Sequence, residues 1–114
     1  MSNKLNRQQM LLIIAAEECN ELGQRISKAL RFGVDEIQPG QDLNNMQRIM
    51  YEYTDLLCVM GMIADNGKEF PKNINVKSLE EKRTKVEKYL KFSQECGTLQ
   101  SDEDEQVTNI TNKF

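Results

Sequence analysis

The sequence predicts an all-α protein, a helical bundle of about three main helices that is completed by oligomerisation. Long segments repeat their apolar residues with a helical period, and capping residues and glycines bound each segment. No segment shows a strand pattern that outweighs these helical ones. Because three helices alone make a thin bundle, we expect a partner subunit to supply a further layer.

The first helix is expected between Asn6 and Gly33. Asn6 and Gln9 resemble a capping pair, in which each side chain accepts a hydrogen bond from the other residue's backbone. Gly33 supplies a stop, since glycine readily ends a helix. At a rise of about 1.5 Å per residue, this helix would be about 40 Å long.

The second helix follows a loop in the segment GVDEIQPGQ, which Pro39 and Gly40 mark as a turn. Asp42 can cap this helix, because its short side chain accepts hydrogen bonds from free backbone amides. We expect the helix to run to about Asp65 and to end at Asn66–Gly67.

The third helix follows a second loop, GKEFPKNINVK. The segment Ser78–Glu81 has the S-x-x-E pattern of a capping box, and the helical pattern continues to about Glu95 and stops at Gly97. The remaining residues are polar and acidic, and we expect them to be mobile or docked on another subunit. The sequence therefore predicts a domain at 1–97 and a tail at 98–114.

Composition narrows the class of protein. A chain of 114 residues suits a single domain, and its net charge of −3 argues against binding to a nucleic-acid polymer, which needs a basic surface. This balance leaves room for a small basic pocket for a phosphorylated ligand. Neither a signal peptide nor a run of about 18 apolar residues occurs, so we expect a cytoplasmic protein without a membrane partner.

Cys19, Cys58 and Cys96 are an odd number without C-x-x-C spacing, which predicts free, partly buried thiols in a reducing compartment. Histidine is absent from the chain. A P-loop nucleotide enzyme is excluded, because the pattern GxxxxGK[ST] does not occur.

Acidic residues interrupt the apolar stripes of the first two helices. At about 100° per residue, Glu18 lies inside the apolar stripe of the first helix, Glu21 about 60° away at its edge, and Glu17 about 100° away. On the second helix, Glu52 lies inside the stripe and Asp55 about 60° to the side. Packing the two stripes together would gather Glu18, Glu21, Glu52 and Asp55 into one cluster.

The negative charge of such a cluster must be compensated. Two unit charges about 4 Å apart repel by roughly 4 kcal/mol at an effective dielectric constant of about 20, and burial adds to this penalty. Either the acids hold protons or a cation lies among them. Oxygen ligands suit Mg²⁺ or Mn²⁺, whereas the lack of histidine argues against zinc and against a Glu-x-x-His di-iron site. Acidic motifs of this kind are also common on solvated helix faces.

The pattern EExxE followed by ExxD resembles the all-α nucleoside triphosphate pyrophosphohydrolases of the MazG type. The segments EECNELGQRISKALRFG and MYEYTDLLCVMGMI are similar to its small single-domain members, including phage-encoded ones, and the likeness covers about residues 8–66. The resemblance implies hydrolysis of an NTP or dNTP between its α and β phosphates. The products would be a monophosphate and pyrophosphate, in the service of nucleotide-pool control.

The resemblance also implies roles for the acids. Glu18, Glu21, Glu52 and Asp55 would hold Mg²⁺, or Mn²⁺ in its place. The metal would neutralise phosphate charge and lower the pKa of the attacking water. Glu17 would be the base for that water or a residue that supports the ligands.

Basic residues supply candidate phosphate contacts. Arg25 and Lys28 project about 20° and 80° from Glu18, so they either reach phosphate oxygens or pair with neighbouring acids. The family also places basic residues after its ExxD motif, which favours Lys85 and Lys88, although a charged helix such as this one is usually solvated.

Two features depart from the family pattern. The stretch between the motif halves, at 22–51, is somewhat long, and no tryptophan is present to stack on a base. The aromatic residues that would have to take that role, each of them also a candidate for the core, are Phe32, Tyr51, Tyr53, Phe70 and Tyr89. The methionines expected in the core or at an interface are Met46, Met50, Met60 and Met62.

The sequence thus predicts a Mg²⁺-dependent (d)NTP pyrophosphohydrolase that acts as a homodimer or homotetramer. The rival hypothesis is a non-catalytic helical interaction module, in which the acids serve a partner or remain from a degenerate site. A response to divalent metal discriminates between the two hypotheses.

Overall fold

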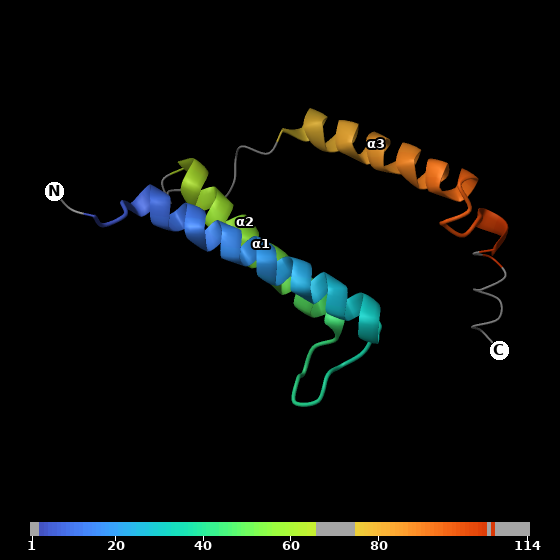
Figure 1. Cartoon of the computed structure of the whole chain (residues 1–114), viewed down its shortest axis with the longest axis horizontal. Coiled ribbons are helices and arrows are strands. Elements are labelled where there is room, and N and C mark those ends of the chain that lie inside the picture. Colours follow the sequence, from blue (N-terminus) through green and yellow to red (C-terminus); the bar gives the residue numbers. More distant parts are fainter. Residues whose placement is uncertain (1–2, 66–74, 105, 107–114) are drawn as a thin grey trace. The chain divides into compact units, whose positions relative to one another are not determined.

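The computed structural model describes residues 3–65, 75–104 and 106 (Figure 1). These residues contain three main helices, which are α1 (Arg7–Phe32), α2 (Asn45–Asp65) and α3 (Val76–Glu95). No strand occurs among the described residues, so the predicted all-α class is confirmed for them. None of the described helices combines the length and the apolar composition that a membrane span requires.

The chain divides into two compact units, Met1–Asn73 and Ile74–Phe114, and each is described by itself. The first unit is a helical hairpin, in which α1 and α2 pack side by side and run antiparallel (Figure 1). The second unit contains α3 and the beginning of the tail. The predicted division at residue 97 stays a prediction.

Helix α1 has the predicted ends. The Asn6 side chain accepts a hydrogen bond from the Gln9 amide at 2.8 Å, and the Gln9 side chain accepts one from the Asn6 amide at 2.9 Å. Two of the free amides at the helix end are thereby satisfied. At the other end, the Gly33 amide donates to the Ala29 carbonyl at 2.8 Å with φ of 107°, a conformation that favours glycine.

Helix α2 begins at Asn45, so the predicted cap at Asp42 is wrong. Asn44 and Gln47 form the reciprocal pair instead, with hydrogen bonds of 2.8 Å and 2.9 Å between side chains and backbone amides. Asn44 offers the same acceptor chemistry as Asp42, and Gln47 stands at the position that completes a capping box. The predicted end of the helix at Asn66–Gly67 lies outside the described residues.

Hydrogen bonds of Asn45 link the start of α2 to the end of α1. Its side chain is buried, and its Nδ2 donates to the Gly33 carbonyl at 2.7 Å and to Glu36 Oε1 at 3.2 Å. The backbone amides of Asn45 and Met46 donate to the carbonyls of Glu36 and Val34, each at 2.9 Å. These bonds fix where α2 starts relative to α1, much as a polar residue in a coiled-coil seam fixes register.

Substituting Asn45 by alanine should therefore lower the free energy of unfolding by about 1–3 kcal/mol, because the Gly33 carbonyl would lose its donor in a partly buried position. Urea denaturation measures this change. Gln41→Ala, at an exposed position of the same loop, is the control and should change stability by less than about 0.5 kcal/mol. Equal effects of the two substitutions would contradict the assigned role of Asn45.

Helix α3 begins at Val76, two residues before the predicted start. The cap is Asn75, whose side chain accepts a hydrogen bond from the Ser78 amide at 3.1 Å. The predicted capping box at Ser78–Glu81 is wrong, because Ser78 already lies within the first turn. The predicted end is confirmed, since the helix stops at Glu95 and Gly97 has φ of 81°.

The beginning of the tail is hydrogen-bonded to the end of α3. Gln94 Nε2 donates to the Gln100 carbonyl at 3.0 Å and to Asp102 Oδ1 at 3.1 Å. Ser101 and Asp104 then form a reciprocal capping pair, with both bonds at 3.1 Å. Residues 105 and 107–114 of the predicted tail lie outside the described residues.

The core of the hairpin is small. Its buried apolar side chains are Leu11, Ala15 and Ala29, whereas many large apolar side chains on both helices are exposed. The three thiols are free, as predicted, but they are exposed rather than partly buried. The hairpin as described therefore leaves a large part of its apolar surface in contact with solvent.

Candidate metal centre

Three carboxylates converge between α1 and α2. Glu18 comes from the middle of α1, whereas Glu52 and Asp55 lie one turn apart on α2. Each offers a carboxylate oxygen, and these oxygens all lie within 4.8 Å of one another. The structure therefore brings together acids that are more than 30 residues apart in sequence.

Glu21, the fourth acid of the predicted cluster, lies one turn after Glu18 and contacts Glu52. Its side chain is hydrogen-bonded to that of Glu52. Glu21 is exposed and is not one of the three groups whose oxygens meet within 4.8 Å.

Burial and mutual repulsion act on the acids in the centre. Partial burial raises the pKa of Glu18 above its ordinary value of 4.5, and the negative charges of Glu21, Asp55, Glu52 and Glu17 raise it further. A carboxyl group in these surroundings holds its proton more tightly than it would in water, because the charged form is both desolvated and repelled.

Glu52 is affected in the same way. Partial burial raises the pKa of Glu52, and so do the charges of Glu21 and Asp55 and the hydrogen bond to Glu21. The positive charge of Arg25 opposes these effects and lowers the pKa of Glu52. Arg25 therefore lies close enough to the acids to compensate part of their charge.

Several buried polar atoms in the centre have no hydrogen-bond partner among the residues that the structure describes. They include Oε2 of Glu18, Oε2 of Glu52 and one terminal nitrogen of the Arg25 guanidinium. A buried polar atom without a partner costs about 1–3 kcal/mol, so such atoms are commonly paired with a ligand or an ion. Two unpaired acceptors beside one unpaired donor suit a cation together with an anionic group.

The donor set fits a small hard cation. Oxygen ligands of Mg²⁺ lie about 2.1 Å from the ion, so two of them on one ion are at most about 4.2 Å apart. The separations within 4.8 Å among Glu18, Glu52 and Asp55 come close to this limit, and small side-chain rotations would close the difference. Only oxygen atoms are offered, which favours Mg²⁺ or Mn²⁺ over softer metals.

The other candidates on α1 lie around this centre. Glu17 is exposed, and its charge is one of the causes of the raised pKa of Glu18, so it lies near that carboxyl. Lys28 is half-buried and follows Arg25 by one turn on the same helix.

Two of the predicted phosphate contacts lie on α3. Lys85 and Lys88 are exposed on α3, which belongs to the second unit. Two surface hollows along α3 are lined by side chains of that helix. The predicted phosphate contacts of Lys85 and Lys88 stay predictions.

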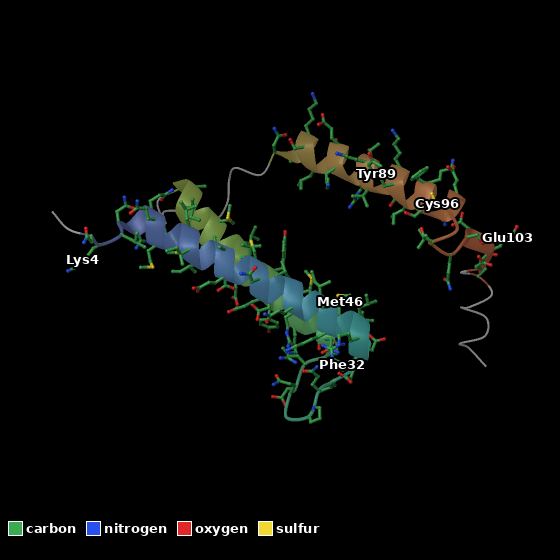
Figure 2. The ribbon with its side chains drawn as sticks, in the orientation of Figure 1. Lys4, Phe32, Met46, Tyr89, Cys96 and Glu103 are labelled. Atoms are coloured by element: carbon green, nitrogen blue, oxygen red, sulfur yellow. The ribbon has the colours of Figure 1, made fainter. Side chains whose placement is uncertain are left out.

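The aromatic residues considered for stacking on a nucleobase lie in different parts of the chain. Tyr51 is 64% exposed and precedes Asp55 by one turn of α2, on the side where the acids open to solvent. Tyr53 lies two positions away, on another side of α2. Phe32, at the end of α1 (Figure 2), lies under the Arg31 guanidinium, 4.9 Å from the ring centroid. Tyr89 is on α3, and Phe70 lies outside the described residues.

Two residues near the site were missed from sequence. Asn45 positions α2, and Arg48 is half-buried one turn before Glu52, with its Nη1 donating to Gln38 Oε1 at 2.8 Å. The spacing of Arg48 and Glu52, four residues on one helix face, was a signal that could have identified Arg48. Asn45 could have been identified as a polar residue at a position of the seam, seven residues before Glu52.

Comparison with known proteins finds no match to this chain among family models, curated proteins or solved structures. The resemblance to the MazG type therefore stays a prediction, and the function is inferred from the geometry and chemistry of the metal centre.

Proposed function

We propose that this protein is a Mg²⁺-dependent nucleoside triphosphate pyrophosphohydrolase of the MazG type. Its substrate would be an NTP or dNTP, which it would cleave to a monophosphate and pyrophosphate as a means of nucleotide-pool control. One observation carries the proposal: acids from two antiparallel helices converge, and the partly buried Glu18 and Glu52 each have an oxygen without a donor.

The carboxylates would hold the metal. Glu18, Glu52 and Asp55 offer the converging oxygens, and Glu21, which lies beside Glu52, would join them. Mg²⁺ bound there would neutralise phosphate charge and lower the pKa of the attacking water. Mn²⁺ has the same ligand preference and would serve in its place.

Basic residues around the acids would bind the phosphates. Arg25 has an unpaired guanidinium nitrogen beside Glu52, and a guanidinium can donate two parallel hydrogen bonds to a phosphate group. Lys28 lies one turn further along α1, at a distance that suits a second phosphate. These contacts would orient the polyphosphate along α1, so that the phosphorus to be attacked lies next to the carboxylates.

Glu17 would act as the base. It is exposed, in contrast to Glu18, and it lies near the centre without belonging to the converging group. A carboxylate in this position would accept a proton from the attacking water at one of its oxygens. Tyr51, exposed on the same side of the hairpin, would be available to stack on the nucleobase of the substrate.

The experiment that tests the function is a nucleotide panel. Purified protein is incubated with each NTP and dNTP, with Mg²⁺ or with EDTA, and pyrophosphate release is measured. We expect release from at least one nucleotide in the presence of Mg²⁺ and none with EDTA. No release from any nucleotide would overturn the enzymatic proposal and favour the non-catalytic interaction module.

A further inference from the structure

The loop between α1 and α2, at 33–44, closes one end of the hairpin (Figure 1). Within this loop, Glu36 and Gln38 are half-buried, whereas Asp35, Ile37 and Pro39 are exposed. Side chains alternate between two sides in an extended segment, so every second side chain of this stretch turns inwards.

Both inward side chains of the loop are hydrogen-bonded to the first turn of α2. Glu36 Oε1 accepts from Asn45 Nδ2 at 3.2 Å, and Gln38 Oε1 accepts from Arg48 Nη1 at 2.8 Å. Gln38 thereby restricts the rotation of the long, half-buried side chain of Arg48. A guanidinium has five N–H donors, so most of them stay available to a ligand.

Arg25 and Arg48 both lie between the carboxylates and the loop. Glu18 and Glu52 mark the level of the metal centre on the two helices. Arg25 follows Glu18 by two turns of α1, whereas Arg48 precedes Glu52 by one turn of α2. Because the helices run antiparallel, both steps lead towards the loop, by about 10 Å on α1 and about 6 Å on α2. The two arginines therefore leave their helices at levels less than about one turn apart.

Both arginines are also directed to the side on which the acids open to solvent. At about 100° per residue, Arg25 is offset by about 20° from Glu18, in the same sense as Glu21. On α2, Arg48 is offset by about 40° from the inward direction, in the same sense as Asp55. Acidic and basic groups thus follow one another along one side of the hairpin, with the basic groups next to the loop.

The two guanidinium groups lack a close counter-charge. Among the residues that the structure describes, neither Arg25 nor Arg48 forms an ion pair with an acid. One terminal nitrogen of Arg25 is buried without a hydrogen-bond partner, and Arg48 lies in the first turn of α2. A positive charge in that turn is disfavoured, because the N-terminal end of the helix dipole is positive. A bound anion would compensate both charges.

The backbone at the start of α2 is already satisfied within the chain. The amides of Asn45 and Met46 donate to loop carbonyls. The amide of Gln47 donates to the Asn44 side chain, and that of Arg48 to the Asn44 carbonyl. The first amides of a helix often bind phosphate, but these four are occupied. An anion at this end of the site would therefore be bound by the arginine side chains.

We propose that Arg48 and Arg25 together bind the β and γ phosphates of the substrate, and that Gln38 positions the Arg48 guanidinium for this contact. This inference rests on the proposed function and adds a direction to it. The end of the triphosphate that leaves as pyrophosphate would face the loop, while the α phosphate lies next to the carboxylates.

A neutral acceptor suits the role of a positioning residue. Gln38 accepts a hydrogen bond without adding a negative charge, so Arg48 keeps its full charge for an anion. A glutamate at this position would hold the guanidinium more firmly, because a charge-assisted hydrogen bond is stronger. It would also compensate the charge that attracts phosphate. A contact that only fastened the loop would gain from glutamate, whereas phosphate binding would lose.

Binding of pyrophosphate, which needs no turnover, tests the proposal. Isothermal titration calorimetry with pyrophosphate and Mg²⁺ should show binding to the wild type, and Arg48→Met should raise the dissociation constant by about tenfold or more. Arg7→Met makes the same chemical change at the exposed start of α1 and should leave the constant unchanged. A wild type that does not bind pyrophosphate would overturn the proposal, and so would equal constants for the wild type and Arg48→Met.

Variants of Gln38 separate positioning from loop stability. Gln38→Ala should weaken pyrophosphate binding in the wild type but cause no further loss in the Arg48→Met background, because Gln38 acts through Arg48. Gln38→Glu should keep or raise the melting temperature and yet weaken binding. Gln41→Ala, at an exposed position of the same loop, is the control and should bind as the wild type does. Unchanged binding by Gln38→Glu, or equal losses from Gln38→Ala in both backgrounds, would overturn the positioning role.

A milder variant guards against loss of folding. Arg48→Lys keeps the charge but replaces the planar fork by a point charge, so binding should fall less than in Arg48→Met while the circular dichroism spectrum stays unchanged. Wild-type affinity in Arg48→Lys would overturn the guanidinium contact. Nucleotide hydrolysis together with pyrophosphate binding that does not depend on Arg48 would overturn this inference alone. Binding that depends on Arg48 without hydrolysis of any nucleotide would support the anion site and overturn only the proposed reaction.

Discussion

Replacing Glu52 by glutamine should reduce pyrophosphate release by about 100-fold or more at saturating Mg²⁺. Glu52 interacts with the other three acids of the site, since it converges with Glu18 and Asp55 and is hydrogen-bonded to Glu21. Glutamine keeps the shape of the glutamate side chain, but its amide oxygen is a neutral ligand. The metal site therefore loses one negative charge. A loss of about 3 kcal/mol of transition-state stabilisation, within the range for metal catalysis, corresponds to roughly a 100-fold lower rate.

The matched control is Glu87→Gln on α3, which makes the same chemical change at an exposed position. It should keep nearly full activity, which shows that the loss does not follow from a changed net charge. Steady-state pyrophosphate release at several Mg²⁺ concentrations measures both variants. Retention of more than about a tenth of the activity by Glu52→Gln at every Mg²⁺ concentration would remove Glu52 from the ligand set.

Magnesium should raise the melting temperature of the wild-type protein on the order of 10 °C. Binding to the folded state alone adds about 2.7 kcal/mol of stability at a ligand concentration of 100 times the dissociation constant. For a small domain, each kcal/mol shifts Tm by about 4–8 °C. Differential scanning fluorimetry of EDTA-treated protein, with Mg²⁺ added back, measures the shift, and Glu52→Gln should lose most of it.

In the metal-free protein, protonation of Glu18 and Glu52 should relieve the electrostatic repulsion among the clustered carboxylates. The pKa values of Glu18 and Glu52 are raised in the folded state, so the folded chain binds these protons more tightly than the unfolded chain does. Stability from this source is gained as pH falls from neutrality towards 4.5, the ordinary value, and is lost as pH rises through the raised pKa values. A Tm that does not rise between pH 7 and about pH 5 without metal would contradict this account, whereas Glu52→Gln should respond less than the wild type.

Local chemistry explains which helix ends the sequence could predict. The ends at Asn6, Gly33 and Gly97 follow from capping bonds or backbone conformations that involve only a few neighbouring residues. The starts of α2 and α3 were misplaced at Asp42 and Ser78, because several polar residues within a few positions offer the same acceptor. Which of them caps a helix depends on where packing lets the helix begin.

In the candidate site, too, some features follow from the local sequence and others depend on packing. Helical spacing alone placed Glu18 and Glu52 in apolar stripes, and packing of those stripes brings their oxygens within 4.8 Å together with Asp55. Spacing did not show that Glu21 bonds to Glu52, or that an Arg25 nitrogen is left without a partner. These details depend on side-chain rotation between two helices, which periodicity does not specify.

By itself, the sequence determined the helical class, the limits of α1 and the set of acids that face inwards, because each depends on a period or a cap within one segment. Only the tertiary structure decided that Asn45 links α2 to α1 by hydrogen bonds, and which oxygens are unpaired. The physical reason is that antiparallel packing joins residues far apart in the chain. Their distances and unmet hydrogen bonds arise from the register of two helices and not from either helix alone.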